Sequence, residues 1–190
     1  MTTKDRIKQE LLKLLEKYSA DDLTLKLFCA ESGLSKQTLY NHYYCLMDAL
    51  EDAYRSEFTG RLRDCGHYLN WVEGFRTLLV ILLDRRQVCL HLYRSSRGED
   101  FMEIIRKYGV TLLEKGIDDC ARDRGFTVSD KDRTFMLRFY MYVFMGIIRD
   151  FIEGKLQEDP DYIAGRCDVM MRHHIRHSLQ NLKDLEEGRF

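Results

Sequence analysis

Apolar side chains recur every three to four positions along almost the whole chain, with charged and polar side chains between them. Near the start, Ile7, Leu11, Leu14 and Leu15 follow this spacing, which places them on one face of an amphipathic helix. No segment alternates between apolar and polar with a period of two, so no β-strand is predicted. We expect an all-α fold of about nine helices, over residues 4–18, 25–32, 35–43, 46–65, 71–83, 86–95, 98–123, 130–153 and 160–186.

Several of these helix ends carry residues that start or stop helices. Gly33 stands where a helix ends in a left-handed residue. Asp159 and Pro160 combine a cap with a proline in the first turn, which predicts the start of the last helix. Ser96, with Glu99 three residues later, predicts a capping box at the start of the seventh helix.

The most informative stretch joins two short helices through a tight turn. Gly33 permits the turn, Leu34 fills the space between the helices, and Ser35 caps the second helix. This arrangement is typical of a helix-turn-helix unit, which places its second helix in a DNA major groove. From composition alone, a short amphipathic helix with a polar solvent face fits equally well.

The second helix of this unit divides into an apolar and a polar face. Leu39 and Tyr43 lie four residues apart and are expected to face the core. The opposite face carries side chains that reach bases and phosphates: lysine to guanine or phosphate, glutamine or asparagine to adenine, and a tyrosine hydroxyl to phosphate. The candidates for DNA contact, on this helix and beside it, are Thr24, Lys26, Ser35, Lys36, Gln37, Thr38, Tyr40, Asn41, His42 and Tyr44.

Residues 33–43, GLSKQTLYNHY, resemble the signature of the TetR family of bacterial transcription regulators, G-[VL]-S-x-x-T-[LF]-Y-x-[HY]-[FY]. The placement also fits, with one helix before the motif in a chain of 190 residues. The resemblance covers about residues 4–55. It implies a three-helix DNA-binding head over 1–46 and an effector-binding and dimerisation domain over 47–190. The sequence departs from the family where Leu46 replaces a lysine that often approaches a phosphate.

The rest of the chain bears a looser resemblance to a TetR subgroup labelled regulators of dihydroxyacetone kinase operons, through residues such as Trp71 and the segment GIIRDFIEG at 146–154. The resemblance implies a ligand cavity between the fourth and eighth helices. Its candidate lining residues are Trp71, Phe75, Tyr93, Phe101, Tyr108, Arg138, Phe139 and Tyr142. Aromatic residues at helical spacing also fit a plain core. Arg138, with Tyr142, fits either an anionic ligand or a solvated or interface position.

The same resemblance implies that the last two helices pair two subunits as a four-helix bundle. The helix over 130–153 is apolar on nearly every face, so it must be buried on more than one side. A central helix of a monomeric bundle satisfies this as well, and Gly146 would permit close approach of a neighbouring helix. The candidate interface residues are Phe144, Ile148, Phe151, Cys167, Met171 and Ile175.

Composition narrows the classes of function. Thirty basic and 31 acidic residues give a net charge of −1, which excludes nucleic-acid binding by bulk charge but not a locally positive face. Six cysteines occur without a C-x-x-C pair, and with no signal-peptide pattern at the start they favour reduced cytoplasmic thiols. No apolar run approaches the roughly 18 residues that a membrane span requires, so no membrane partner is expected.

Sequence motifs of enzymatic chemistry do not occur. The chain has no glycine-rich phosphate loop, no G-x-S-x-G and no H-E-x-x-H, so we expect neither enzymatic activity nor a cofactor. His173 and His177 lie one helical turn apart beside His174, a spacing that fits a shared metal. A polar helix edge explains them more simply, and we expect no metal. No cysteine lies in a motif that would activate its thiol.

The sequence therefore predicts a homodimeric, ligand-responsive transcription regulator, with repression as the expected direction, that binds a near-palindromic operator in double-stranded DNA. Its effector is an unknown small molecule or a protein partner. The alternative is an all-helical adaptor or co-regulator that acts through a protein partner without its own operator binding. Leu46 and the near-neutral head support keeping this alternative.

Overall fold

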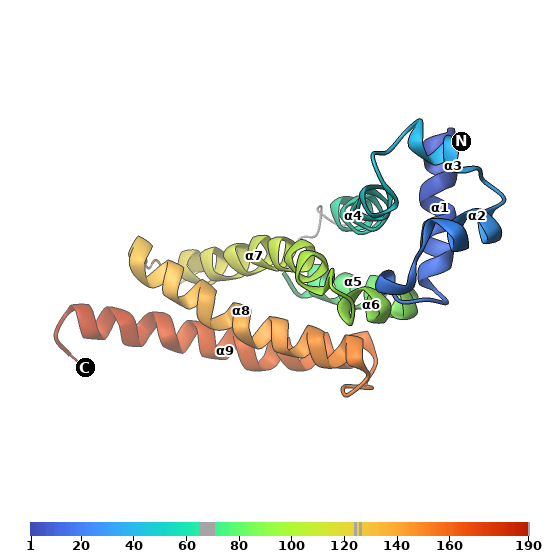
Figure 1. Cartoon of the computed structure of the whole chain (residues 1–190). Helices are drawn as coiled ribbons and strands as arrows, with labels where there is room; N and C mark the ends of the chain where they lie inside the picture. Colours follow the sequence, from blue (N-terminus) through green and yellow to red (C-terminus); the bar gives the residue numbers. More distant parts are fainter. Residues whose placement is uncertain (65–70, 124, 126, 190) are drawn as a thin grey trace. The chain divides into compact units, whose positions relative to one another are not determined.

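The computed structural model of the chain describes residues 1–64, 71–123, 125 and 127–189. Within these ranges it forms nine α-helices and no β-strand, which confirms the predicted all-α class (Figure 1). Helices α1 to α9 span Thr3–Leu15, Leu25–Ser32, Lys36–Tyr40, Leu46–Asp64, Trp71–Asp84, Arg86–Tyr93, Gly98–Asp123, Asp130–Glu153 and Pro160–Glu186. A short 3-10 turn, Ala20–Asp22, follows α1. Residue 65, the predicted end of α4, lies outside the described residues.

The helix ends follow the predicted capping residues with one exception. Gly33 ends α2 with a φ of 65°, and the Asp159 side chain accepts a hydrogen bond from the backbone N–H of Tyr162 at 2.8 Å. The capping box predicted at Ser96 is wrong. The hydroxyl of Ser96 donates to the carboxylate of Asp21 instead, and α7 begins at Gly98 all the same.

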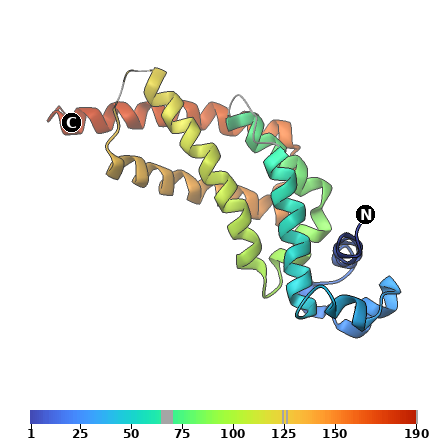
Figure 2. The same ribbon diagram turned by 90° about the horizontal axis from the view of Figure 1, so that it is seen from above.

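The helices form two compact units, residues 1–64 with 82–105 (unit 1) and residues 65–81 with 106–190 (unit 2). The division differs from the expected boundary after residue 46. The reason is packing: α1 contacts α4, which Figure 2 shows beside it, and α1 also contacts α6. Unit 1 therefore holds α4 and α6 together with the first three helices.

Unit 1 has an aromatic core and a set of polar contacts around it. The rings of Phe58 and Phe101 meet edge to face with centroids 5.0 Å apart. The ring nitrogen Nδ1 of His91, on α6, lies 2.6 Å from the backbone carbonyl of Leu15 at the end of α1. Asp21 accepts hydrogen bonds from both the backbone and the hydroxyl of Ser96. The two polar contacts join residues about 75 positions apart in the chain.

Unit 2 is built on packing between α5, α7, α8 and α9. The ring of Phe144 lies 4.3 Å from that of Phe75 and 5.8 Å from that of Trp71, measured between centroids. Helices α5 and α7 approach closely at Gly74, where a Cβ atom would lie 2.4 Å from the side chain of Leu112. A larger residue there would require the Leu112 side chain to move.

Two further features bear on the predicted chemistry. Among the described residues, the cysteines are all free thiols, and burial raises the pKa of Cys89 far above its usual value. That thiol is therefore unreactive under ordinary conditions. None of the helices in the described ranges is both long enough and apolar enough to cross a membrane.

Candidate nucleic-acid interface

Helices α2 and α3 are set by local hydrogen bonds that the sequence encodes. Thr24 caps α2 by accepting from the backbone N–H of Leu27 at 3.2 Å, and Ser35 caps α3 by accepting from that of Thr38 at 3.0 Å. In the turn, Ser32 is buried and accepts from the N–H of Leu34 at 3.1 Å. Two short helices that could not persist alone are thus fixed at both ends of the turn.

The core side of this helix-turn-helix is apolar, as predicted. Phe28 and Leu39 are fully buried, and Leu34 and Tyr43 are nearly so. Because α3 has only five residues, its position depends on these anchors rather than on its own helical stability.

The outer side of α3 carries the candidate DNA-contacting residues. The exposed ones are Thr24, Lys26, Ser35, Lys36, Gln37, Tyr40, Asn41, His42 and Tyr44. Thr38 is half-buried, with its hydroxyl 2.8 Å from that of Ser35. The hydroxyls of Thr24 and Ser35 are already engaged as caps, so they help to shape the surface. Lys26 and Lys36 form no ion pair with any described residue, which leaves their ammonium groups open to phosphates.

Two amides in this surface pair with each other. The Nε2 group of Gln37 donates to Oδ1 of Asn41 at 2.9 Å, one helical turn away. Gln37 keeps its Oε1 acceptor and one Nε2 hydrogen, and Asn41 keeps both Nδ2 hydrogens, so the pair still offers the acceptor and donor that the major-groove edge of adenine complements. The two residues therefore form one reading element.

Helix α3 ends at Tyr40 and not at the predicted residue 43. The chain turns because the side chain of Tyr43 enters the core and its hydroxyl donates to Asp52 on α4 at 2.7 Å. The next backbone N–H, that of Tyr44, donates to the carboxylate of Asp48 at 3.1 Å and not to a helical carbonyl. Tyr44 is left almost fully exposed at 92%.

The start of α4 contributes no positive charge to this surface. Leu46 is buried, with 8% of its surface exposed, so it fills space in the core. The charged residue of the first turn is the acidic Asp48. The sequence did not predict the contacts of Asp52 with Tyr43 and with the lysines of α1. The feature that could have indicated them is Tyr43 itself, a side chain with a polar hydroxyl at a position where the helical pattern requires burial.

The residues predicted to line a ligand cavity belong to both units. Phe101 and Tyr93 belong to unit 1, where Phe101 packs on Phe58. In unit 2, Trp71 and Phe75 are buried against Phe144, and Tyr108 is half-buried.

The roles predicted for Arg138 and Tyr142 as cavity residues stay predictions. Both are exposed, because the side of α8 on which they stand faces away from its own unit. Phe139 shares that exposed side, where 48% of its surface is accessible.

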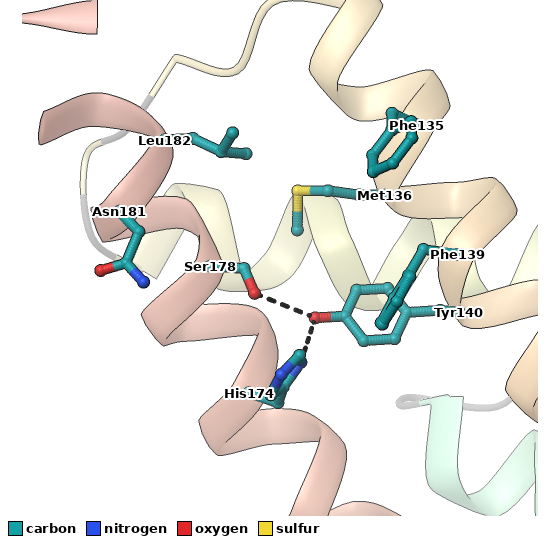
Figure 3. A pocket seen from close by; sticks show the side chains of 8 residues that line it. All are labelled: Phe135, Met136, Phe139, Tyr140, His174, Ser178, Asn181 and Leu182. Carbon is teal, nitrogen blue, oxygen red and sulfur yellow. Dashed lines mark hydrogen bonds between the residues drawn. The ribbon is translucent and has the colours of Figure 1, made fainter. Parts of the chain in front are cut away.

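Phe139 does line a pocket, between α8 and α9 (Figure 3). The pocket has a volume of about 260 Å³. At its base, the hydroxyl of Tyr140 lies 2.9 Å from Nδ1 of His174 and 3.4 Å from the hydroxyl of Ser178. Its lining residues are Phe135, Met136, Phe139, Tyr140, His174, Ser178, Asn181 and Leu182. The pocket is small for a ligand site.

The six residues predicted at the dimer interface are buried within a single chain. The exposed fractions of Phe144, Ile148, Phe151, Cys167, Met171 and Ile175 do not exceed 8%. These side chains lie on the side of α8 and α9 that packs on unit 2, and their place in a dimer interface stays a prediction. The opposite side carries exposed apolar residues, which we call the α8–α9 face: Phe135, Phe139, Tyr142, Val143, Tyr162, Val169 and Met170.

The histidine cluster shows no metal-site geometry. His173 and His177 are exposed, and His174 contacts Tyr140. Within the described part of the chain, no group of three or more histidine, cysteine or acidic residues is placed to hold a metal ion.

Comparisons with known proteins extend this description. The family described as "Transcriptional regulator C-terminal region", a TetR family, matches residues 69–173. Among solved structures, the chain is similar to "Dihydroxyacetone kinase operon activator DhaS", with a TM-score of 0.71 and 17% sequence identity over 92% of this chain and 97% of the other. At this identity the similarity establishes the fold. No curated protein sequence matches the chain.

Proposed function

Since the chain belongs to the TetR family of transcription regulators, we propose that it binds an operator in double-stranded DNA as a homodimer, with α3 as the reading helix. Members of this family are regulators and not enzymes. The observation that carries the proposal is the exposed polar surface of α3, which is fixed by two caps and a buried turn. On this surface the Gln37–Asn41 pair is suited to bases and Lys36 and Tyr40 to phosphates.

The α8–α9 face supports the homodimer. Large apolar side chains stand exposed on it, with Tyr142 at 81% and Met170 at 70%, and exposure of such a contiguous set is typical of an interaction site. Gly146 and Gly165 lie exposed on the same helices, and a Cβ at either would meet nothing within 4 Å. Two copies of these helices can therefore approach closely at the glycines.

A two-fold pair presents two reading helices to one side of the DNA. Such a pair requires half-sites related by the same two-fold axis, with centres separated by about 34–36 Å or a multiple of that distance. The operator is therefore expected to be a near-palindrome. A second copy seated on the α8–α9 face would also cover the pocket at Phe139.

Selection of duplexes from a random-sequence pool tests operator binding without knowledge of the operator. We expect enrichment of an inverted repeat, bound with an affinity that falls as salt is raised. A chain that enriches no sequence and binds no duplex at low salt would favour the adaptor alternative, in which a protein partner supplies the DNA contact. Buried Leu46 and the acidic Asp48 at the start of α4 are the observations behind that alternative.

An effector and the direction of regulation complete the proposal. A small molecule or partner can release DNA only by binding the DNA-competent and incompetent conformations unequally. The sequence suggests repression, whereas DhaS is named an activator, so the same fold serves activation in that protein. A reporter gene placed behind the selected operator, with and without the regulator, gives the direction directly.

A further inference from the structure

A cluster of polar side chains ties the end of the reading helix to α1 and α4. The carboxylate of Asp52, on α4, accepts hydrogen bonds from the hydroxyl of Tyr43 at 2.7 Å and from that of Ser56 at 3.0 Å. The ammonium groups of Lys4 and Lys8, both on α1, lie 3.2 and 3.6 Å from the oxygen that Tyr43 contacts. We call these five residues the Asp52 cluster.

The cluster remains charged and compact at physiological pH. Partial burial alone would raise the pKa of Asp52, but the hydrogen bonds from Tyr43, Lys4 and Ser56 lower it to about 2. The ammonium of Lys4 also lies 5.0 Å from the centre of the Tyr43 ring, a position favourable for a cation–π contact. Lys8 donates in addition to the hydroxyl of Ser56 at 3.2 Å.

The cluster lies beside the surface proposed to meet DNA. Tyr43 stands between the exposed residues His42 and Tyr44, just past the end of α3. Lys4 and His42 line the same polar hollow of about 330 Å³, together with Asp52. In helix-turn-helix complexes the DNA backbones that flank the major groove pass close to the residues beside the end of the recognition helix. Cationic side chains at such positions normally bind phosphates.

We infer that the Asp52 cluster sets the sequence selectivity of DNA binding by fixing the end of α3 and by keeping the cations of Lys4 and Lys8 paired within the protein. The inference rests on the proposed DNA-binding function. A lysine already paired with a carboxylate displaces few counterions from DNA, so it adds little to sequence-independent affinity. Binding then depends more heavily on the base contacts of α3. Asp52 is a positioning residue in this scheme, because it contacts no DNA itself.

Three variants separate the two roles of the cluster. Asp52→Asn releases both lysines while retaining an acceptor for Tyr43. Tyr43→Phe removes the hydrogen bond between Asp52 and the residue that follows α3, and it leaves Lys4 and Lys8 paired with Asp52. Glu51→Gln is the control for net charge, because it removes one negative charge from the neighbouring position on α4, where Glu51 pairs with Arg55 and Arg97 and not with α1.

The measurement is fluorescence anisotropy over a series of salt concentrations with two 30-bp probes, a duplex selected by the wild-type protein and a shuffled duplex of the same composition. For Asp52→Asn we expect about 3- to 10-fold tighter binding to the shuffled duplex at low salt. The slope of log K against log salt should steepen by about 1–2, as expected for one or two added phosphate contacts. The preference for the selected duplex should fall several-fold.

For Tyr43→Phe the preference should fall without tighter binding to the shuffled duplex, and for Glu51→Gln it should stay at the wild-type value. Equal effects of Asp52→Asn and Glu51→Gln would overturn the inference, because bulk charge would then explain both. An unchanged preference in both Asp52→Asn and Tyr43→Phe, with wild-type melting temperatures, would also overturn it. Failure of the wild-type protein to bind either duplex is a different result, which refutes the proposed function itself.

Discussion

The α3 surface and the α8–α9 face are both exposed, but they are made in opposite ways. The α3 surface consists of the exposed polar side chains on and beside this five-residue helix, held by caps, a glycine turn and the Asp52 cluster. The α8–α9 face consists of large apolar side chains on two long helices. A polar surface that is rigidly held suits selective recognition of a polar groove, whereas an apolar one gains most by exclusion of water. The difference supports the proposal that the two surfaces serve two kinds of partner.

The largest effect is expected from a charge on the buried side of α8. Phe144→Asp places a carboxylate among Trp71 and Phe75, where its exposed fraction is 0%. We expect a loss of about 4–5 kcal/mol or more in the free energy of unfolding, because a buried charge without a partner is costly. Chemical denaturation monitored by circular dichroism measures it. Stability equal to that of the wild type would show that Phe144 is accessible after all.

A charge on the exposed side of the same helices should separate subunits and leave the fold intact. For the double variant Tyr142→Asp, Met170→Asp we expect monomers in sedimentation velocity and at least 100-fold weaker binding to the selected duplex, equivalent to about 2.7 kcal/mol. Leu185→Asp is the matched control, since Leu185 is also exposed on α9 but lies outside the α8–α9 face. A wild-type protein that sediments as a monomer at micromolar concentration would contradict the proposed pair.

Within the α3 surface, the Gln37–Asn41 pair should behave as one unit. Gln37→Ala and Asn41→Ala are each expected to cost about 1–3 kcal/mol in binding to the selected duplex. The double variant should cost clearly less than the sum, because each single change already breaks their hydrogen bond at 2.9 Å. Anisotropy titrations of the four proteins give this coupling energy. Strict additivity would mean that the two amides contact DNA independently.

The smallest effect concerns stability at acidic pH. Because the folded-state pKa of Asp52 is lowered to about 2, its ionised form stabilises the fold fully above the unfolded value of about 4 and ceases to do so as pH falls toward 2. After allowance for screening by solvent, we expect a contribution of about 1 kcal/mol. Thermal melts of the wild type and Asp52→Asn between pH 6 and 2.5 should converge at the acidic end. A constant difference would assign the effect to packing.

Local signals in the sequence predicted most of the fold and the shape of the reading unit. Caps such as Ser35 and turns such as Gly33 depend on neighbouring residues only, so their roles were readable from the sequence and are present in the structure. The direction in which α8 faces was not readable. A helix that is apolar on nearly every side does not reveal which side the chain covers, so the sequence did not show that Phe144 is buried and Tyr142 exposed. The Asp52 cluster was missed because Asp52 lies 48 positions from Lys4 in the chain.

Unit 1 is assembled from two separate segments of the chain, which has a consequence for the order in which the protein folds during synthesis. The partner of Phe58 is Phe101, that of the Leu15 carbonyl is His91, and that of Asp21 is Ser96. During synthesis the DNA-reading half therefore lacks part of its core until residues 82–105 have left the ribosome, which happens after α1 to α4 have emerged. A fragment that stops at residue 64 reproduces that early intermediate, with an exposed Phe58 and a tendency to aggregate, and is a poor substitute for the complete regulator.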